Sequence, residues 1–161
     1  MKRHAFVLTG LLLATQVSAQ EIVLGLGYSD FLDSTAADAA LMEVEYHHRP
    51  FLERNRLSLG WGAMLSYDTE DDFFFGGGLV ATYGFDESWF VEGSLMPGAY
   101  FKGNPFNDLG HKLEFRSLLG IGHRIDDRSA LSLAVVHKSN ASISATNPGV
   151  NSLLLRYHRS F

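Results

Sequence analysis

The 161-residue sequence has no cysteine, so no disulfide can stabilise the fold, whatever the redox state of its compartment. It also lacks a Ser/Pro-rich linker, a low-complexity block and a shift in composition, and these absences predict one domain. Beyond residue 19, no apolar run approaches the roughly 20 residues of a membrane-spanning helix. If the chain enters a membrane, it must therefore do so as a closed β-barrel, in which every backbone polar group is paired.

The first 19 residues have the pattern of a secretory signal peptide. Two cationic residues, Lys2 and Arg3, precede an apolar run over residues 5–14, and the small residues of Val17-Ser18-Ala19 follow. We expect residues 1–19 to be removed and residues 20–161 to form the mature domain.

The charge balance argues against nucleic acid as a partner. The chain has 13 Lys and Arg residues and 18 Asp and Glu residues, for a formal net charge of −5. Removal of the signal peptide takes away two cations and no anion, which makes the mature chain more acidic. An acidic surface is repelled by a phosphate backbone.

Large apolar side chains alternate with small or polar ones over four long segments, at residues 57–67, 73–85, 89–101 and 113–124. This period of two is the pattern of a β-strand, whose successive side chains point to opposite faces. In the first segment, the apolar face holds Leu57, Leu59, Trp61, Ala63, Leu65 and Tyr67. The chain is therefore predicted to be all-β.

Two features favour a transmembrane barrel with its apolar face outside and Glu92, Glu114 and Arg116 paired inside. The segments run for roughly 9 to 12 residues, which suits a tilted membrane-spanning strand better than a strand of a soluble sheet. Aromatic residues gather near the segment ends, where interfacial girdles are expected: Tyr67, Phe73, Phe85, Trp89 and Phe101. A soluble lipocalin-like barrel, with the apolar face inside, stays open as the alternative.

The connections alternate between longer and tighter, as in a barrel with long loops at one end. The longer or more polar stretches lie near residues 31–40, 68–72, 102–110 and 143–149, and the tighter ones near 49–55, 86–88 and 126–129. This spacing predicts an eight-stranded antiparallel transmembrane β-barrel with both termini at the short-turn, periplasmic end. The last segment ends in Phe161 after alternating apolar residues, which resembles the signal read by the bacterial outer-membrane insertion machinery.

A histidine and a serine share the apolar face near the end of the strand predicted at residues 131–140. Leu131, Leu133 and Val135 form that face, and His137 and Ser139 continue it toward a long loop. Residues two apart on a strand lie about 6.5 Å apart along it, so the imidazole can act as a base for the hydroxyl. The alternative is that the strand has reached the lipid headgroups at residue 137, where polar side chains are common.

The segment His137-Lys138-Ser139-Asn140, followed by Asn147-Pro148-Gly149-Val150-Asn151, resembles the C-terminal hairpin of the PagL-type lipid A 3-O-deacylases. The clear match covers residues 137–152. The resemblance implies an outer-membrane barrel of eight strands with an esterase site on its lipid-facing wall. Its substrate would be lipid A of lipopolysaccharide, hydrolysed at the 3-hydroxyacyl ester of position 3, without a cofactor or a metal ion.

By the same resemblance, His137 is the general base and Ser139 the nucleophile. Asn147 is the counterpart of the family residue that helps to bind the oxyanion, with a backbone amide near Ser142 as its companion and Asn140 in support. Where the best-known members have a glutamate that orients the histidine, this chain has Asn151. An amide oxygen can hold the ring but brings no charge, and this exchange in a serine protease triad costs about 10⁴ in rate because the amide can select the wrong tautomer.

Other residues have simpler interpretations. Lys138 and Asn140 alternate inward, and the neighbours His47 and His48 point to opposite faces, which argues against a shared metal ion. Two other functions stay open: a non-enzymatic small outer-membrane barrel for adhesion or envelope integrity, and a soluble periplasmic binding barrel. The sequence leaves open whether the barrel forms a homodimer.

Overall fold

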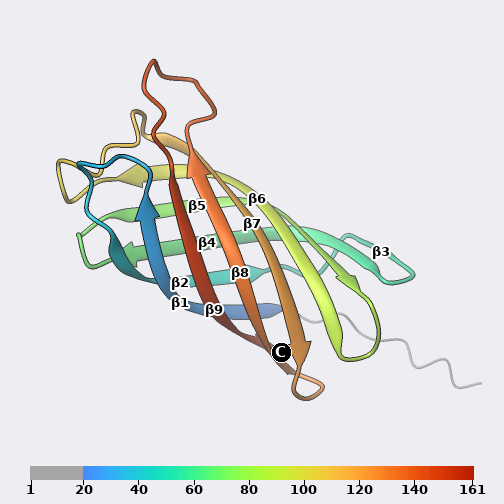
Figure 1. The fold of residues 1–161 in the computed structure, drawn as a ribbon. Coiled ribbons are helices and arrows are strands. Elements are labelled where there is room, and N and C mark those ends of the chain that lie inside the picture. The colour runs from blue at the N-terminus through green and yellow to red at the C-terminus, as the bar shows by residue number, and fades with distance from the viewer. Residues whose placement is uncertain (1–19) are drawn as a thin grey trace, which may run out of the picture.

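A computed structural model describes residues 20–161, so the predicted signal peptide lies outside the described residues. The described chain is all-β, and Figure 1 shows its strands in chain order. The strands are β1 (Glu21–Phe31), β2 (Ala39–His47), β3 (Leu52–Arg54), β4 (Leu57–Asp68), β5 (Phe73–Gly84), β6 (Trp89–Phe101), β7 (Leu113–Arg124), β8 (Ser129–Ser139) and β9 (Val150–Ser160). No helix in this part of the chain is long and apolar enough to cross a membrane.

The strands form a closed antiparallel barrel. Consecutive strands pair with each other except β2 and β3, which both pair with β4, and β9 pairs with β1 to close the ring. The predicted eight-stranded barrel is thereby confirmed, with β3 as an addition outside the ring. The two ends of the described chain meet, since the N–H of Phe161 donates to the carbonyl of Gln20 at 2.9 Å.

The connection between β2 and β4 is not the tight turn that we predicted at residues 49–55. After β2 the chain continues alongside β4: the N–H of His48 donates to the carbonyl of Trp61 at 2.8 Å, and that of Phe51 to Leu59 at 3.0 Å. Pro50, which has no N–H to donate, interrupts this pairing. The hairpin of β3 and β4 therefore projects beyond the barrel at the short-turn end (Figure 1).

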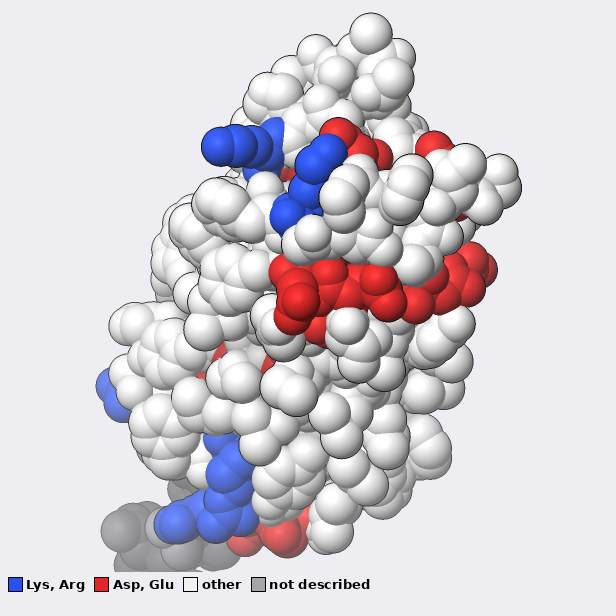
Figure 2. Space-filling view, turned by 90° about the vertical axis from the view of Figure 1, so that its left-hand side faces the viewer, with Lys and Arg blue, Asp and Glu red and all other residues white. Residues whose placement is uncertain are grey.

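Apolar side chains cover the outside of the wall. Leu26, Leu119 and Leu155 are 67%, 62% and 59% exposed, whereas Glu45, Arg156 and Glu114 on the inward parity are fully buried. A soluble barrel would have the opposite arrangement, so the lipocalin-like alternative is wrong and the apolar wall faces lipid. Figure 2 shows this uncharged wall below a band of acidic side chains near the long loops.

Aromatic side chains form girdles at both ends of the apolar wall, as predicted. At the long-loop end, the rings of Phe73 and Phe75 each lie 6.3 Å from that of Phe101. At the short-turn end, Phe85 packs against Tyr83 with ring centroids 5.8 Å apart. These aromatic borders place the two membrane interfaces about one strand length apart.

The middle of the barrel is filled by a buried ion-pair network. Arg116 contacts Glu43 at 2.8 Å and Glu45 at 2.7 Å, and Arg156 contacts Glu45 at 2.8 Å and Glu92 at 2.6 Å. The predicted pairing among Glu92, Glu114 and Arg116 is wrong. Arg116 pairs with Glu43 and Glu45, and Glu92 pairs with Arg156. Both carboxylate oxygens of Glu114 are buried and without a hydrogen-bond partner within residues 20–161.

The long-loop half of the interior contains an apolar cluster beside buried polar residues such as Asp72 and Asn107. Phe74, Met96, Leu109 and Val150 belong to one buried cluster there, with Tyr100 beside them. Lys138 points inward, as predicted, and its ammonium lies 4.8 Å from the ring centroid of Phe74. The interior beneath the β8–β9 hairpin is therefore packed, which gives the outer wall of that hairpin a rigid support.

Candidate active site

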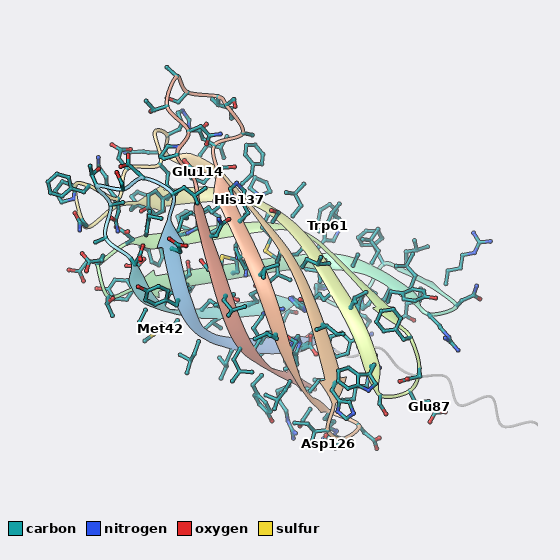
Figure 3. All side chains as sticks on the ribbon, in the orientation of Figure 1. Met42, Trp61, Glu87, Glu114, Asp126 and His137 are labelled. Carbon is teal, nitrogen blue, oxygen red and sulfur yellow. The ribbon has the colours of Figure 1, made fainter. Side chains whose placement is uncertain are left out.

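The two candidate catalytic side chains lie on the outer wall near the long-loop end of β8. His137 is exposed and shares its parity with Leu133 and Val135, which are 51% and 57% exposed. Ser139, on the same parity, is half-buried. In Figure 3, His137 lies near the end of β8 that leads into the long loop, whereas Asp126, in the turn between β7 and β8, marks the short-turn end of the barrel.

The imidazole of His137 is held by Asn151 on the neighbouring strand. The two residues are direct partners in the β8–β9 register, and Nδ1 of His137 lies 2.8 Å from Oδ1 of Asn151. An amide oxygen can only accept, so in this orientation of the Asn151 amide a neutral His137 ring carries its proton on Nδ1. The lone pair of Nε2 is then available to accept a proton from a nucleophile.

The hydroxyl of Ser139 lies one step further along β8, at the last residue of the strand. Within residues 20–161 it forms no hydrogen bond with His137. Catalytic contacts of this kind often tighten only when substrate is bound. Ser139 is also the register partner of Phe115 on β7.

Asn140, directly after the candidate nucleophile, ties three loop segments together. It is fully buried, and its Nδ2 donates to the carbonyls of Leu109 and Thr146, at 2.8 Å each. Its backbone N–H donates to Oδ1 of Asn147 at 2.9 Å. Asn140 therefore fixes the loop after β8 against the β6–β7 loop. In that second loop, hydrogen bonds from Lys102 and Gly110 lower the pKa of Asp108.

Two glycines are required for these contacts. Gly149 has a positive φ of 74°, and a Cβ there would lie 3.1 Å from Cε1 of His137. Gly110 has a φ of 87°, and its Cβ would lie 2.2 Å from the carbonyl oxygen of Thr146. A side chain at either position would displace the imidazole or the loop that Asn140 holds.

The loop after β8 presents hydrogen-bond donors near Ser139. Oδ1 of Asn147 is engaged by the N–H of Asn140, so the Nδ2 donor of Asn147 is the end that stays available. Ala141 and Ser142 have positive φ values of 52° and 64°, a strained conformation for residues with a Cβ that is often found at functional sites. The hydrogen bonds of the described chain leave the N–H groups of both residues without a protein acceptor.

Sequence reasoning missed two residues that share the outer face with His137. Across the register, Asp30 of β1 is the direct partner of Asn151, and Ser117 of β7 is the direct partner of His137. Both side chains are exposed. The signal for Asp30 was present in the alternation of Leu24, Leu26 and Tyr28 before it, but only the register shows that it lies next to Asn151.

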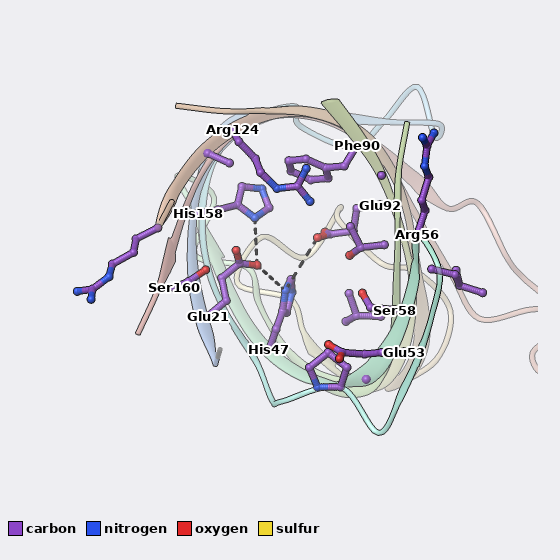
Figure 4. A pocket seen from close by; sticks show the side chains of 18 of the residues that line it. Glu21, His47, Glu53, Arg56, Ser58, Phe90, Glu92, Arg124, His158 and Ser160 are labelled. Atoms are coloured by element: carbon purple, nitrogen blue, oxygen red, sulfur yellow. Dashed lines mark hydrogen bonds and ion pairs between the residues drawn. The ribbon is translucent and has the colours of Figure 1, made fainter. Parts of the chain in front are cut away.

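A separate polar cluster lines a cavity of about 490 Å³ at the short-turn end of the barrel (Figure 4). Glu21, His47 and Glu92 form the one group of three potential metal ligands in residues 20–161. Nδ1 of His47 contacts Glu21 at 3.0 Å, and its Nε2 contacts Glu45 at 2.9 Å. Because both ring nitrogens are already paired with carboxylates, the cluster is explained as part of the internal ion-pair network. It lies at the opposite end of the barrel from His137.

Comparisons with known proteins agree with this arrangement. Comparison with curated protein sequences gives no match. Among solved structures, the outer-membrane enzyme PagL is similar with a TM-score of 0.64 and 18% identity, covering 88% of this chain and 99% of that one. A de novo designed transmembrane β-barrel (TM-score 0.61, 8% identity, 89% and 96% covered) and Neisserial surface protein A (0.57, 12%, 88% and 96%) share the fold.

The family comparison is more specific than the shared fold. The model of the lipid A 3-O-deacylase (PagL) family matches residues 40–160. This range is most of the chain and includes the hairpin with His137, Ser139 and Asn151. The chain therefore belongs to the PagL family of lipid A 3-O-deacylases.

Proposed function

We propose that this protein is a lipid A 3-O-deacylase of the bacterial outer membrane, with Ser139 as nucleophile and His137 as general base. The observation that carries the proposal is the hydrogen bond of 2.8 Å between His137 and Asn151 on a lipid-facing wall. It leaves the free lone pair of the imidazole on the same face as a serine hydroxyl two residues away. A barrel that serves only adhesion or envelope integrity needs no such arrangement.

In the first half of the reaction, the hydroxyl of Ser139 attacks the carbonyl carbon of the acyl ester. Nε2 of His137 takes the hydroxyl proton as the bond forms. The negative charge that develops on the carbonyl oxygen is bound by Nδ2 of Asn147 and the N–H of Ser142. The tetrahedral intermediate then collapses: the bond to the sugar oxygen breaks, and that oxygen receives the proton from His137.

In the second half, water replaces the sugar. His137 removes a proton from a water molecule, which attacks the acyl-enzyme carbonyl. The bond to the Ser139 oxygen breaks, the proton returns to Ser139, and a free 3-hydroxy fatty acid leaves. Each step uses groups of the protein, water and the ester.

The location of the site suits a substrate that is itself part of the membrane. His137 and the aromatic girdle of Phe73, Phe75 and Phe101 both lie toward the long-loop end of the apolar wall, which supports a substrate ester at the border between sugar and acyl tail. We propose that the long loops face the outside of the cell, so that the site meets the outer leaflet. Lipid A then reaches the site by lateral diffusion.

Mass spectrometry of lipid A tests the activity directly. Cells whose lipid A carries the 3-O-acyl chain would express the wild type, Ser139→Ala or an empty vector. We expect loss of one hydroxyacyl chain with the wild type alone. If the wild type leaves lipid A unchanged, the barrel is not a deacylase, and if Ser139→Ala also removes the chain, Ser139 is not the nucleophile.

The Asn147→Asp variant tests the roles of the oxygen and the NH₂ group of the Asn147 amide separately. The carboxylate keeps the acceptor for the N–H of Asn140 but replaces the proposed oxyanion donor with an oxygen. We expect kcat to fall about 10²-fold or more, with KM and the unfolding midpoint little changed. Retention of kcat within about threefold would exclude Asn147 from the oxyanion hole. Asn147→Ala, which removes both ends, is the comparison that shows how much the loop contact contributes.

A further inference from the structure

An asparagine beside a catalytic histidine raises a problem that a carboxylate does not. The amide of Asn151 can present either its oxygen or its NH₂ group to Nδ1 of His137. With the oxygen presented, the proton sits on Nδ1 and Nε2 is a base. With NH₂ presented, the proton moves to Nε2 and the imidazole can no longer accept the Ser139 proton. Activity therefore depends on a group that fixes the amide orientation.

The barrel places a carboxylate on the other side of Asn151. Because β9 lies between β8 and β1, Asn151 has His137 as its direct partner on one side and Asp30 on the other. Directly opposed residues on one face have Cβ atoms about 4.5 to 5.5 Å apart. With Oδ1 of Asn151 committed to His137 at 2.8 Å, its Nδ2 is the end left for the β1 side.

A carboxylate at this position can favour only one orientation of the amide. Ionised Asp accepts hydrogen bonds and donates none, so it attracts the NH₂ group of Asn151 and repels its oxygen. The neighbouring acid, Asp38, is already engaged, since it accepts from the N–H of Phe31 at 3.1 Å and from the hydroxyl of Tyr28 at 3.3 Å. Asp30 is the carboxylate that remains on the outer face in the same row as Asn151 and His137.

We propose that Asp30 is a positioning residue of the active site: it holds the amide of Asn151 with its oxygen toward His137 and thereby keeps the imidazole in its catalytic tautomer. Asp30 and Asn151 together then perform the task that one glutamate performs in the best-known relatives. The proposal rests on the proposed deacylase function for its catalytic consequence, but the tautomer of His137 can be measured without any activity.

¹⁵N NMR of histidine-labelled barrel in detergent micelles gives that measurement, since the two ring nitrogens have different shifts in each tautomer. In the wild type at a pH where His137 is neutral, we expect the proton on Nδ1. In Asp30→Asn we expect a substantial population with the proton on Nε2, and in Asp30→Glu we expect a return to Nδ1. His137→Gln assigns the signals. An unchanged Nδ1–H tautomer in Asp30→Asn would overturn the proposal.

A double-mutant cycle, measured by enzyme kinetics, is the second test of this role of Asp30. Asp30→Asn should lower kcat about 10- to 100-fold with little change in KM, less than the 10⁴ of a triad that loses its acid outright, because the amide stays in place. In an Asn151→Asp background, where no amide can turn, Asp30→Asn should cost less than about twofold. Equal losses in both backgrounds would show a role other than orienting the amide. If the wild type has no deacylase activity, the proposed function fails while the NMR result still decides the role of Asp30.

Discussion

Replacing Ser139 with alanine should lower kcat for release of the 3-hydroxy fatty acid about 10⁴-fold or more, with the barrel intact. The variant removes the atom that forms the acyl-enzyme, and the remaining donors of the loop can only assist a direct attack by water. Ser139 is half-buried at the end of β8 and makes no side-chain hydrogen bond within residues 20–161. Its loss should therefore leave the unfolding midpoint unchanged.

The comparison with His137→Ala makes this expectation sharper. Because nucleophile and base act in one step, either single variant should lose nearly as much as the double variant. Ser144→Ala, in the same loop but outside the proposed site, is the matched control and should keep wild-type rates. Losses that add on a logarithmic scale in the double variant would show that the two side chains do not work together. Fatty acid release from lipid A in micelles is the assay.

Arg156→Met should destabilise the barrel by about 3 to 5 kcal/mol. Arg156 is fully buried and contacts Glu45 at 2.8 Å and Glu92 at 2.6 Å. Methionine fills much of the same space, but it leaves buried Glu92 without an arginine partner and Glu45 with Arg116 as its remaining one. Removal of one partner from such a network costs far more than removal of the whole network, because the remaining charges lose their solvation without compensation.

Urea unfolding of the refolded barrel measures this effect. Arg128→Met, at an exposed turn position, is the matched control and should change stability by less than about 0.5 kcal/mol. Adding Glu92→Gln to Arg156→Met should recover part of the loss, since one uncompensated charge is then removed. A loss below about 1 kcal/mol in Arg156→Met would mean that water or a rearranged network replaces the arginine.

Much of the fold can be predicted from the alternation of apolar and polar side chains alone. A period of two assigns each side chain to a face, and where every described element is a strand, as in residues 20–161, the question that remains is which face is outside. The exposure of Leu119 and Leu155 and the burial of Arg116 agree with the prediction made from the polar parity and the segment length. The sequence pattern alone also predicts that His137 and Ser139 lie on the outer wall, because they share the parity of Leu133 and Val135.

What alternation cannot provide is the register between strands that are distant in the chain. Arg116 pairs with Glu43 and Glu45 of β2 rather than with the nearby Glu114, because closure of the barrel decides which inward residues meet. The same limit hid Asp30, which lies more than a hundred residues from its partner Asn151. The β3 hairpin was not predicted because residues 49–55 were expected to form a tighter connection, whereas the chain resumes its pairing with β4 directly after Pro50.

The ion pairs that fill the middle of the barrel also have a consequence for the cell envelope. Because Arg116 and Arg156 with their carboxylates fill the middle of the described barrel, we expect ions and hydrophilic antibiotics to find no open route from one mouth to the other. Porins, whose barrels are wider, have an open aqueous channel for nutrient uptake in its place. A bacterium could therefore carry this protein at high copy number without making its envelope more permeable.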